Sequence, residues 1–193
     1  MRRNNMRTTI ITGHPYSKSF NHALVEKITA ETNATVINLI EDRFNPVMEL
    51  EDLAGFSKGV SHDPLVEKYQ ELLLQTDQLI IVTPIWWYGL PAIYKGFLDK
   101  VMLKGFAYTE TKGRLVGKLT TIQEVLLVTT SEAPKWYIRY FAGNPIKGLK
   151  NRVFKDMGLK KVIWLHQGNI ATTTQKKRQT FIQKVVNRAG LKE

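Results

Sequence analysis

Short runs of β-branched and apolar residues alternate with longer segments of helical period along this whole 193-residue chain. Five of these runs have the length of strands, and they span residues 8–12, 35–39, 78–83, 125–129 and 161–166. Strands that alternate with helices pair in parallel, because the chain crosses back over the sheet between them. We therefore expect an α/β protein with a five-stranded parallel sheet and helices on both faces.

Segments of helical period fill the spaces between these strands. They span residues 20–31, 64–75, 145–157 and 173–188, and a further helix begins at Pro91. Ser19 stands at the N-cap position of the first helix, and Gly158 ends the helix before the last strand. Residues 41–62 follow neither period, so we expect an irregular connection there. A loop rich in Pro and Gly is expected before residue 145.

Nothing in the sequence divides the chain into parts. No long linker, low-complexity tract or internal repeat interrupts the alternation of strands and helices. The composition, with 43% apolar and 23% charged residues, is that of a soluble globular protein with enough chain for one buried core. We therefore expect residues 1–193 to form a single domain.

Cysteine is absent, and this absence excludes several kinds of chemistry. Without cysteine there is no disulfide, thiolate nucleophile, iron–sulfur cluster or cysteine-based zinc site. The four histidines, His14, His22, His62 and His166, show no ligand spacing with carboxylates, so we expect no metal site. The chemistry must use oxygen, nitrogen or a bound cofactor.

The formal net charge of +11 is concentrated in the last quarter of the chain. Residues 147–193 hold 12 basic and only 2 acidic residues, whereas residues 1–146 hold 16 basic and 15 acidic ones. Such a positive field attracts nucleic acid, an anionic membrane surface or a phosphorylated ligand, and a solvated basic helix face is the plainer interpretation. Because no nucleic-acid-binding module is recognisable, nucleic acid is not the expected partner.

No segment predicts export or a membrane span. The basic residues 1–7 resemble the start of a signal peptide, but the apolar run that follows is only two isoleucines long. The longest apolar stretch, residues 79–98, contains Pro84, Gly89, Pro91 and Lys95, which would break and charge a helix in lipid. We therefore expect a cytoplasmic protein.

The loops that follow the strands are the places where a parallel sheet binds ligands. In the first such loop, Ser17, Lys18 and Ser19 come just before a helix begins, where unpaired amides and the helix dipole favour an anion such as phosphate. An ordinary serine N-cap is the alternative interpretation. The glycine patterns of NAD-binding Rossmann sites and of P-loops are both missing, so neither of those sites is predicted.

A second loop, residues 84–89, places Trp86, Trp87 and Tyr88 together where a buried strand ends. Exposed aromatic rings are costly unless something flat covers them, and a planar ring system would do so. The alternative is that these rings belong to the core or to a dimer interface.

Together these segments resemble the flavodoxin-like NAD(P)H quinone oxidoreductases, including the ancillary oxidoreductase subunits of bacterial potassium-efflux systems. The resemblance rests on Gly13-His14-Pro15, on Ser19-Phe20-Asn21 and on residues 84–101, PIWWYGLPAIYKGFLDKV. Residues 44–48, FNPVM, also match a connection common in that family. The resemblance covers roughly residues 8–170 and implies a flavodoxin-like fold.

The resemblance also implies roles for individual residues. The phosphate end of a flavin would be held by His14, Lys18, Ser19, Phe20 and Asn21. The isoalloxazine ring would be lined by Pro84, Ile85, Trp86, Trp87 and Tyr88. The pyrimidine edge of the ring would meet Thr129, Thr130 and Ser131, largely through backbone groups.

The third loop departs from the family pattern. Many relatives follow the paired threonines with two glycines, whereas this chain continues with Ser131-Glu132-Ala133-Pro134, so the floor of the substrate pocket differs. In larger animal relatives a tyrosine and a histidine six residues later assist electron transfer. Counted without gaps from the paired threonines, the same positions in this chain are Tyr137, the candidate catalytic residue, and Gly143 in place of the histidine.

The resemblance implies an enzyme that passes two electrons as hydride from NADH or NADPH through a bound flavin to a quinone or similar acceptor, by a ping-pong mechanism. FMN is expected rather than FAD because the chain is short, and a homodimer is implied. Two alternatives stay open: a one-electron carrier of flavodoxin type, and a subunit whose flavin state regulates a membrane transporter. For the enzyme, we expect the basic residues Lys176, Lys177 and Arg178 to attract the phosphates of NAD(P)H.

Overall fold

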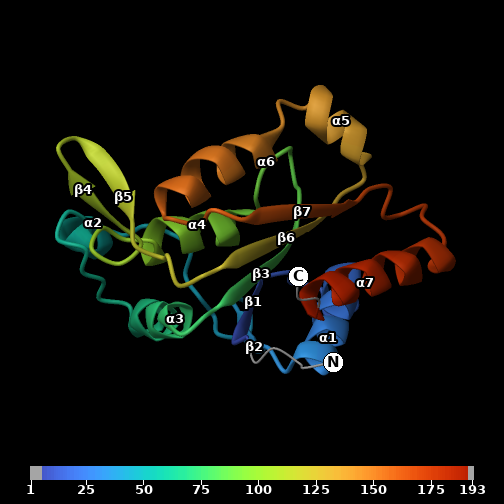
Figure 1. The fold of residues 1–193 in the computed structure, drawn as a ribbon, viewed down its shortest axis with the longest axis horizontal. Coiled ribbons are helices and arrows are strands. Elements are labelled where there is room, and N and C mark those ends of the chain that lie inside the picture. Colours follow the sequence, from blue (N-terminus) through green and yellow to red (C-terminus); the bar gives the residue numbers. More distant parts are fainter. Residues whose placement is uncertain (1–5, 191–193) are drawn as a thin grey trace.

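The computed structural model describes residues 6–190 (Figure 1). The start of the basic segment 1–7 and the last three residues of the basic C-terminal quarter therefore lie outside the described residues. Within residues 6–190, no helix has both the length and the mean hydropathy needed to cross a bilayer.

A five-stranded, all-parallel sheet runs through the molecule in the order β2-β1-β3-β6-β7. Its strands are β1 (Thr8–Thr12), β2 (Thr35–Asn38), β3 (Gln78–Pro84), β6 (Glu124–Thr130) and β7 (Val162–Gln167). All five predicted strands are confirmed, with ends that differ by at most one residue. Because β1 lies between β2 and β3, the strand order switches at β1 and β3, and a crevice for a ligand is expected at their carboxyl ends.

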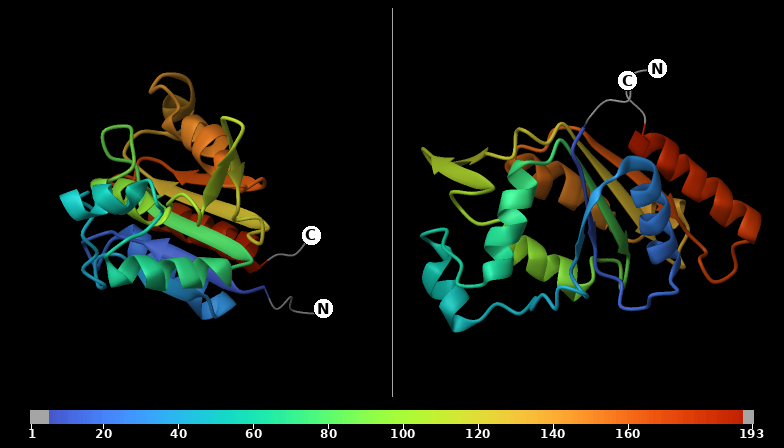
Figure 2. Two further views of the ribbon diagram at one scale, coloured as in Figure 1. Left: turned by 90° about the vertical axis from the view of Figure 1, so that its left-hand side faces the viewer. Right: turned by 90° about the horizontal axis from the view of Figure 1, so that it is seen from below.

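Successive side chains of the central strands point to opposite faces of the sheet, and two cores result. On one face Ile10, Ile80 and Leu126 pack with α1 (Phe20–Thr32) and α7 (Gln175–Gly190). Figure 2 shows these two helices side by side on one side of the sheet. Both helices were predicted from their period, so the sequence predicted this layer.

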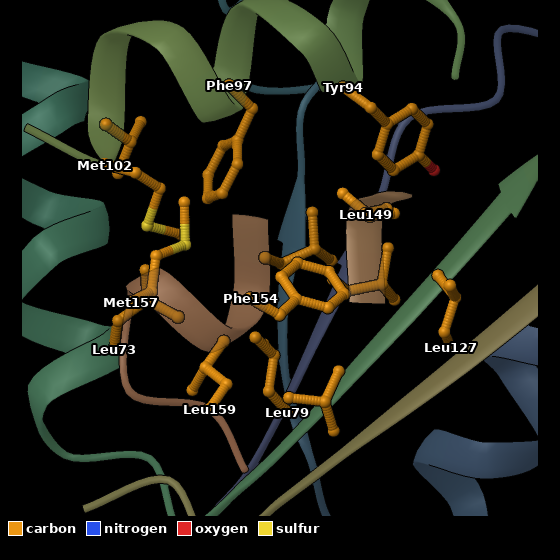
Figure 3. Close-up of a cluster of buried hydrophobic side chains, with 14 of the residues drawn as sticks. Leu73, Leu79, Tyr94, Phe97, Met102, Leu127, Leu149, Phe154, Met157 and Leu159 are labelled. Carbon is orange, nitrogen blue, oxygen red and sulfur yellow. The ribbon is translucent and has the colours of Figure 1, made fainter. Parts of the chain in front are cut away.

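The opposite face of the sheet carries the larger core (Figure 3). Leu79 and Leu127 of the sheet face Phe97 of α4 (Ala92–Val101) there, and α3 (Pro64–Leu74) closes the side. Helices therefore cover both faces, as predicted.

The predicted helix 145–157 is interrupted. An α-helical turn, α6 (Pro145–Gly148), leads into a π-helical segment, η1 (Leu149–Phe154). Leu149 and Phe154 are five residues apart and both are buried. The i→i+5 bonding of a π-helix brings residues five apart toward one side, so burial of both side chains favours this conformation over a regular α-helix.

Three short elements were not predicted. Residues 41–62 contain α2 (Leu50–Phe56), whose start is a reciprocal capping box between Glu49 and Asp52. The loop before residue 145 contains α5 (Lys135–Tyr140). A two-stranded hairpin, β4 (Tyr108–Thr111) and β5 (Arg114–Gly117), projects from the end of the molecule opposite α5 (Figure 1).

A buried ion pair fixes α2 to the core helix α4. Lys100 is 5% exposed, and its ammonium lies 2.9 Å from a carboxylate oxygen of Asp52. The same ammonium donates to the carbonyl of Val47 at 3.2 Å. Removal of one member of a buried pair leaves the other charge without a partner, which costs more than the pair itself contributes.

Lys100→Met is therefore expected to lower the free energy of unfolding by about 3 kcal/mol, the lower end for such a pair because the Asp52 side chain keeps some exposure. Urea denaturation measures this change. Lys95→Met on the same helix is the matched control, because its pair with Asp99 is exposed and is worth about 0.5 kcal/mol or less. Equal losses in the two variants would contradict the role given to Lys100.

Candidate functional site

A pocket of about 570 Å³ opens at the carboxyl end of the sheet. The loops after β1, β3, β6 and β7 all contribute to it. Its lining consists of His14, Pro84, Ile85, Trp86, Trp87, Tyr88, Thr130, Ser131, Glu132, Ala133, Ile138 and Ile170. Eight of the residues predicted for the site thus come together around one space.

The aromatic wall of this pocket is a tight turn with unusual backbone angles. The backbones of Trp86 and Gly89 exchange two hydrogen bonds, of 3.1 and 2.9 Å, and Trp87 and Tyr88 between them have φ values of 47° and 59°. This is the pattern of a type I′ turn, which usually carries Asn or Gly at its two central positions. Large aromatic residues there are strained, by about 1 kcal/mol or more each.

The strain is not offset by packing within the chain, because the Trp87 side chain is 98% exposed. Neighbouring Trp86 and Tyr88 are each 47% exposed. Strained backbone with exposed aromatic rings at a strand end is typical of a site that a ligand completes.

The start of α1 faces the same edge of the sheet but does not line the pocket. The Ser19 hydroxyl accepts a hydrogen bond from the His22 amide at 3.2 Å, so Ser19 is the predicted N-cap. That bond uses one of the free amides of the first turn and leaves those of Phe20 and Asn21 without intrahelical acceptors. Lys18 is exposed beside them. The helix start thus retains the amides and the positive charge that an anion needs.

Two side chains of this helix start have structural contacts. Asn21 is buried and accepts a hydrogen bond from the Thr130 hydroxyl at 3.0 Å, which ties α1 to the end of β6. The ring of Phe20 packs on Phe181 of α7, with ring centroids 6.2 Å apart. The predicted contacts of these side chains with a phosphate stay predictions.

Arg178 is not a free surface charge. Its guanidinium donates to the carbonyl of Ile170 at 2.7 Å and lies 5.9 Å from the ring of Phe20. Of the three basic residues expected to attract phosphates, Lys176 and Lys177 are exposed, whereas Arg178 is part-buried. The sequence indicated the charge of Arg178 but not that it joins α7 to the loop beside the pocket.

His14 joins the first loop to the aromatic turn. Its ring lies edge-on to Trp86, with centroids 5.9 Å apart, and its Nδ1 accepts from the Tyr16 amide at 3.1 Å. Burial lowers the pKa of His14, so the ring is neutral at pH 7.

The floor of the pocket is held by a second loop. The Ser131 amide donates to the Gln167 carbonyl at 3.1 Å, and the Ile170 amide donates back to the Ser131 carbonyl at 3.2 Å. Both carboxylate oxygens of Glu132 accept from the Ala171 amide at 3.1 Å. The residues that replace the glycine pair of the family are therefore fixed by the loop after β7.

Thr129 lies below the floor and does not line the pocket. Its hydroxyl contacts Nδ1 of His166 at 2.7 Å and accepts from the Trp164 indole at 2.8 Å. His166 was considered from the sequence only as a metal ligand. In the described part of the chain, no group of three His, Asp or Glu side chains could hold a metal ion.

Tyr137, the candidate catalytic residue, lies next to Tyr88 of the aromatic turn but does not line the pocket. Its ring centroid is 6.2 Å from that of Tyr88, and it stacks on Phe141 at 5.9 Å. A hydrogen bond with Tyr137 raises the pKa of Tyr88. The catalytic role of Tyr137 stays a prediction.

These features fit a flavin. A flat ring would cover the strained aromatic turn, and the polar backbone groups at the floor would meet its heteroatoms. A phosphate would accept from the amides at the start of α1. The volume of the pocket is within the range of known cofactor and ligand sites.

A model of the family described as "Flavodoxin-like fold" matches residues 6–190. The chain belongs to this family. The flavodoxin-like fold expected from the sequence motifs is thus confirmed.

Two relatives confirm the resemblance to the NAD(P)H quinone oxidoreductases within this fold family. An NAD(P)H oxidoreductase of Haemophilus influenzae is 31% identical over 185 residues, covering 92% of this chain and 91% of that protein. NAD(P)H dehydrogenase (quinone) 1 of Cavia porcellus is 27% identical over 152 residues, covering 68% of this chain but 55% of that protein.

Solved structures share the fold over nearly the whole chain. A Streptococcus mutans protein superposes with a TM-score of 0.83 at 28% identity, covering 95% of this chain and 98% of that one. An FMN-dependent NADH-azoreductase of Bacillus anthracis, solved in complex with FMN, has a TM-score of 0.72 at 20% identity, covering 95% and 97%.

Trp87→Asn tests the strain in the aromatic turn. Asparagine tolerates positive φ better than tryptophan, and the exposed Trp87 ring loses no packing when it is removed. The free energy of unfolding of the variant is expected to equal that of the parent or to exceed it by about 1 kcal/mol. A loss of more than 1 kcal/mol in urea denaturation would show that the ring stabilises the fold.

Proposed function

We propose that this protein is an NAD(P)H:quinone oxidoreductase that uses a bound flavin. The observation that carries the proposal is the pocket at the carboxyl end of the sheet, in which a strained, exposed aromatic turn stands over a polar floor. The named NAD(P)H oxidoreductase and quinone dehydrogenase relatives support the choice of donor and acceptor.

The residues of this chain would bind the flavin and orient its ring. Trp86, Trp87 and Tyr88 would cover the ring, and the backbone of residues 130–133 would hold its polar edge. The start of α1 would hold the phosphate through its free amides, with Lys18 supplying charge. The bound flavin supplies the hydride-transfer chemistry.

FMN is the flavin proposed, with FAD as the alternative. The complex of the structurally similar azoreductase with FMN supports this choice. A homodimer is proposed as well, and the exposed Trp136, Tyr140 and Phe141 beside the pocket are consistent with a surface that a second copy covers. The cytoplasmic location stays a prediction.

A peripheral membrane-protein partner stays a prediction too. Five of the 12 basic residues of the C-terminal quarter line a cavity of about 770 Å³: Lys147, Lys150, Arg152, Lys155 and Lys160. This cavity lies apart from the flavin pocket, with which it shares no lining residue. An acidic partner would dock there, and a pull-down from membranes with the purified protein tests it.

Flavin binding is the first test. The purified protein is expected to quench the fluorescence of added FMN, and Trp87→Asn is expected to weaken the affinity about tenfold, because stacking on one aromatic ring is worth roughly 1–3 kcal/mol. Leu50→Asn on α2 is the control, since Leu50 is an exposed apolar residue that lines neither the pocket nor the proposed dimer surface. Failure of the parent protein to quench either FMN or FAD would overturn the assignment.

Turnover is the second test. Steady-state oxidation of NADH or NADPH by the flavin-loaded protein with a water-soluble quinone is expected to give parallel double-reciprocal lines, because donor and acceptor use the same pocket in turn. Intersecting lines would contradict the shared pocket. Flavin binding without turnover would favour the one-electron carrier.

A further inference from the structure

His166 stands at the end of β7, under the pocket floor. Its Nδ1 lies 2.7 Å from the Thr129 hydroxyl, and its Nε2 lies 3.2 Å from the Ala133 carbonyl and 3.3 Å from the Ser131 hydroxyl. The ring itself does not line the pocket. Any effect of His166 on a ligand must therefore act through Ser131 and Ala133, which do line it.

The partners of the ring select one neutral form. A carbonyl can only accept, so the Nε2 that faces Ala133 must carry the hydrogen. The Trp164 indole can only donate, and it donates to the Thr129 hydroxyl at 2.8 Å. That hydroxyl is then free to donate its own hydrogen to Nδ1 of His166. In this arrangement each donor in the chain Trp164–Thr129–His166–Ala133 has an acceptor.

A second proton on the ring breaks this arrangement. Nδ1 would become a donor and meet the Thr129 hydroxyl, whose hydrogen would then have to turn away. Thr129 is fully buried, so a hydroxyl hydrogen without an acceptor is costly.

The charges around His166 oppose the same proton. Burial lowers the pKa of His166. The hydrogen bond to the Ala133 carbonyl offsets part of this effect, and the ammonium of Lys135 on α5 lowers the pKa further by repulsion. Lys135 is held nearby, because it donates to the Trp164 carbonyl at 3.3 Å and lies 4.6 Å from the Trp164 ring. Of the other groups near the ring, the Glu132 carboxylate is bonded to the Ala171 amide. The side chains that β6 and β7 place beside His166 are Thr129 and Trp164, which carry no charge.

We propose that neutral His166 is a positioning residue that holds the backbone of residues 131–133 as the pocket floor. Protonation keeps the Nε2 donor to Ala133 but sets an Nδ1 hydrogen against the Thr129 hydroxyl, so the ring shifts away from β6, the floor loosens and flavin binding weakens. The identity of the ligand rests on the proposed function. The floor itself does not, because its hydrogen bonds to the loop after β7 are made between residues of this chain.

The direction of the pH effect follows from the lowered pKa. A base whose pKa is lower in the folded state contributes stability that is present above its ordinary pKa of 6.5 and is lost as the pH falls below it. The floor is thus expected to be intact at pH 8 and to loosen in mildly acid solution.

Amide NMR of the flavin-free protein tests the floor directly. Between pH 8 and 5, the amide signals of Ser131 and Ile170 are expected to move with the same midpoint as the ring signals of His166. In His166→Gln, whose side-chain amide can still donate toward Ala133, this movement should disappear. His62→Gln is the matched control on an exposed histidine and should leave the movement unchanged. Persistence of the movement in His166→Gln would overturn the proposal.

FMN affinity over the same pH range tests the consequence for binding. At pH 8, His166→Gln is expected to bind FMN within about threefold of the parent, whereas His166→Leu, which cannot donate, is expected to bind about fivefold more weakly, as for one lost hydrogen bond. As the pH falls, the parent should lose more affinity for FMN than His166→Gln does. Both proteins retain His14, so any effect of that histidine is common to the two. Equal profiles would overturn the role of His166, whereas a parent that binds no flavin at pH 8 would instead contradict the proposed function.

Discussion

The pairing of β3 with β1 on one side and β6 on the other determines where three of the four loops of the site lie. The register places Val82 opposite Thr12, and Pro84 opposite Thr130, so the three strands end at one edge of the sheet. Strand β3 is buried along its whole length, and a shift of one residue would exchange its two faces between the two cores. The burial that fixes this register therefore also fixes the pocket.

The two sides of the pocket are held in different ways. The aromatic turn is strained at Trp87 and Tyr88 and is exposed, so it depends on a ligand for cover. The floor at Ser131 and Ala133 is instead hydrogen-bonded to the loop after β7 and to His166. A rigid polar floor fixes the orientation of a flat ligand, and an exposed aromatic wall supplies contact area, which together suit a tightly held ring system.

The sequence predicted the parts of the fold whose signals are local. Strands buried on both sides appear as continuous apolar runs, and α1 and α7 show their period plainly. The elements that were missed depend on contacts across the fold. Helix α2 is short and is held by Lys100 from α4, and the π-helical turn at η1 follows from the burial of Phe154. The aromatic half of the site could be predicted because Trp86, Trp87 and Tyr88 are adjacent in sequence. The contacts of His166 could not, because its partners lie more than 30 residues away.

A crystal structure of the protein grown with FMN tests the central claim most directly. The account predicts a flavin ring between the turn of residues 86–89 and the floor of residues 131–133, with its phosphate at the start of α1 and the positive φ values of Trp87 and Tyr88 retained. A flavin bound elsewhere on the molecule, or a turn that relaxes to negative φ while the pocket stays free of flavin at saturating FMN, would contradict it.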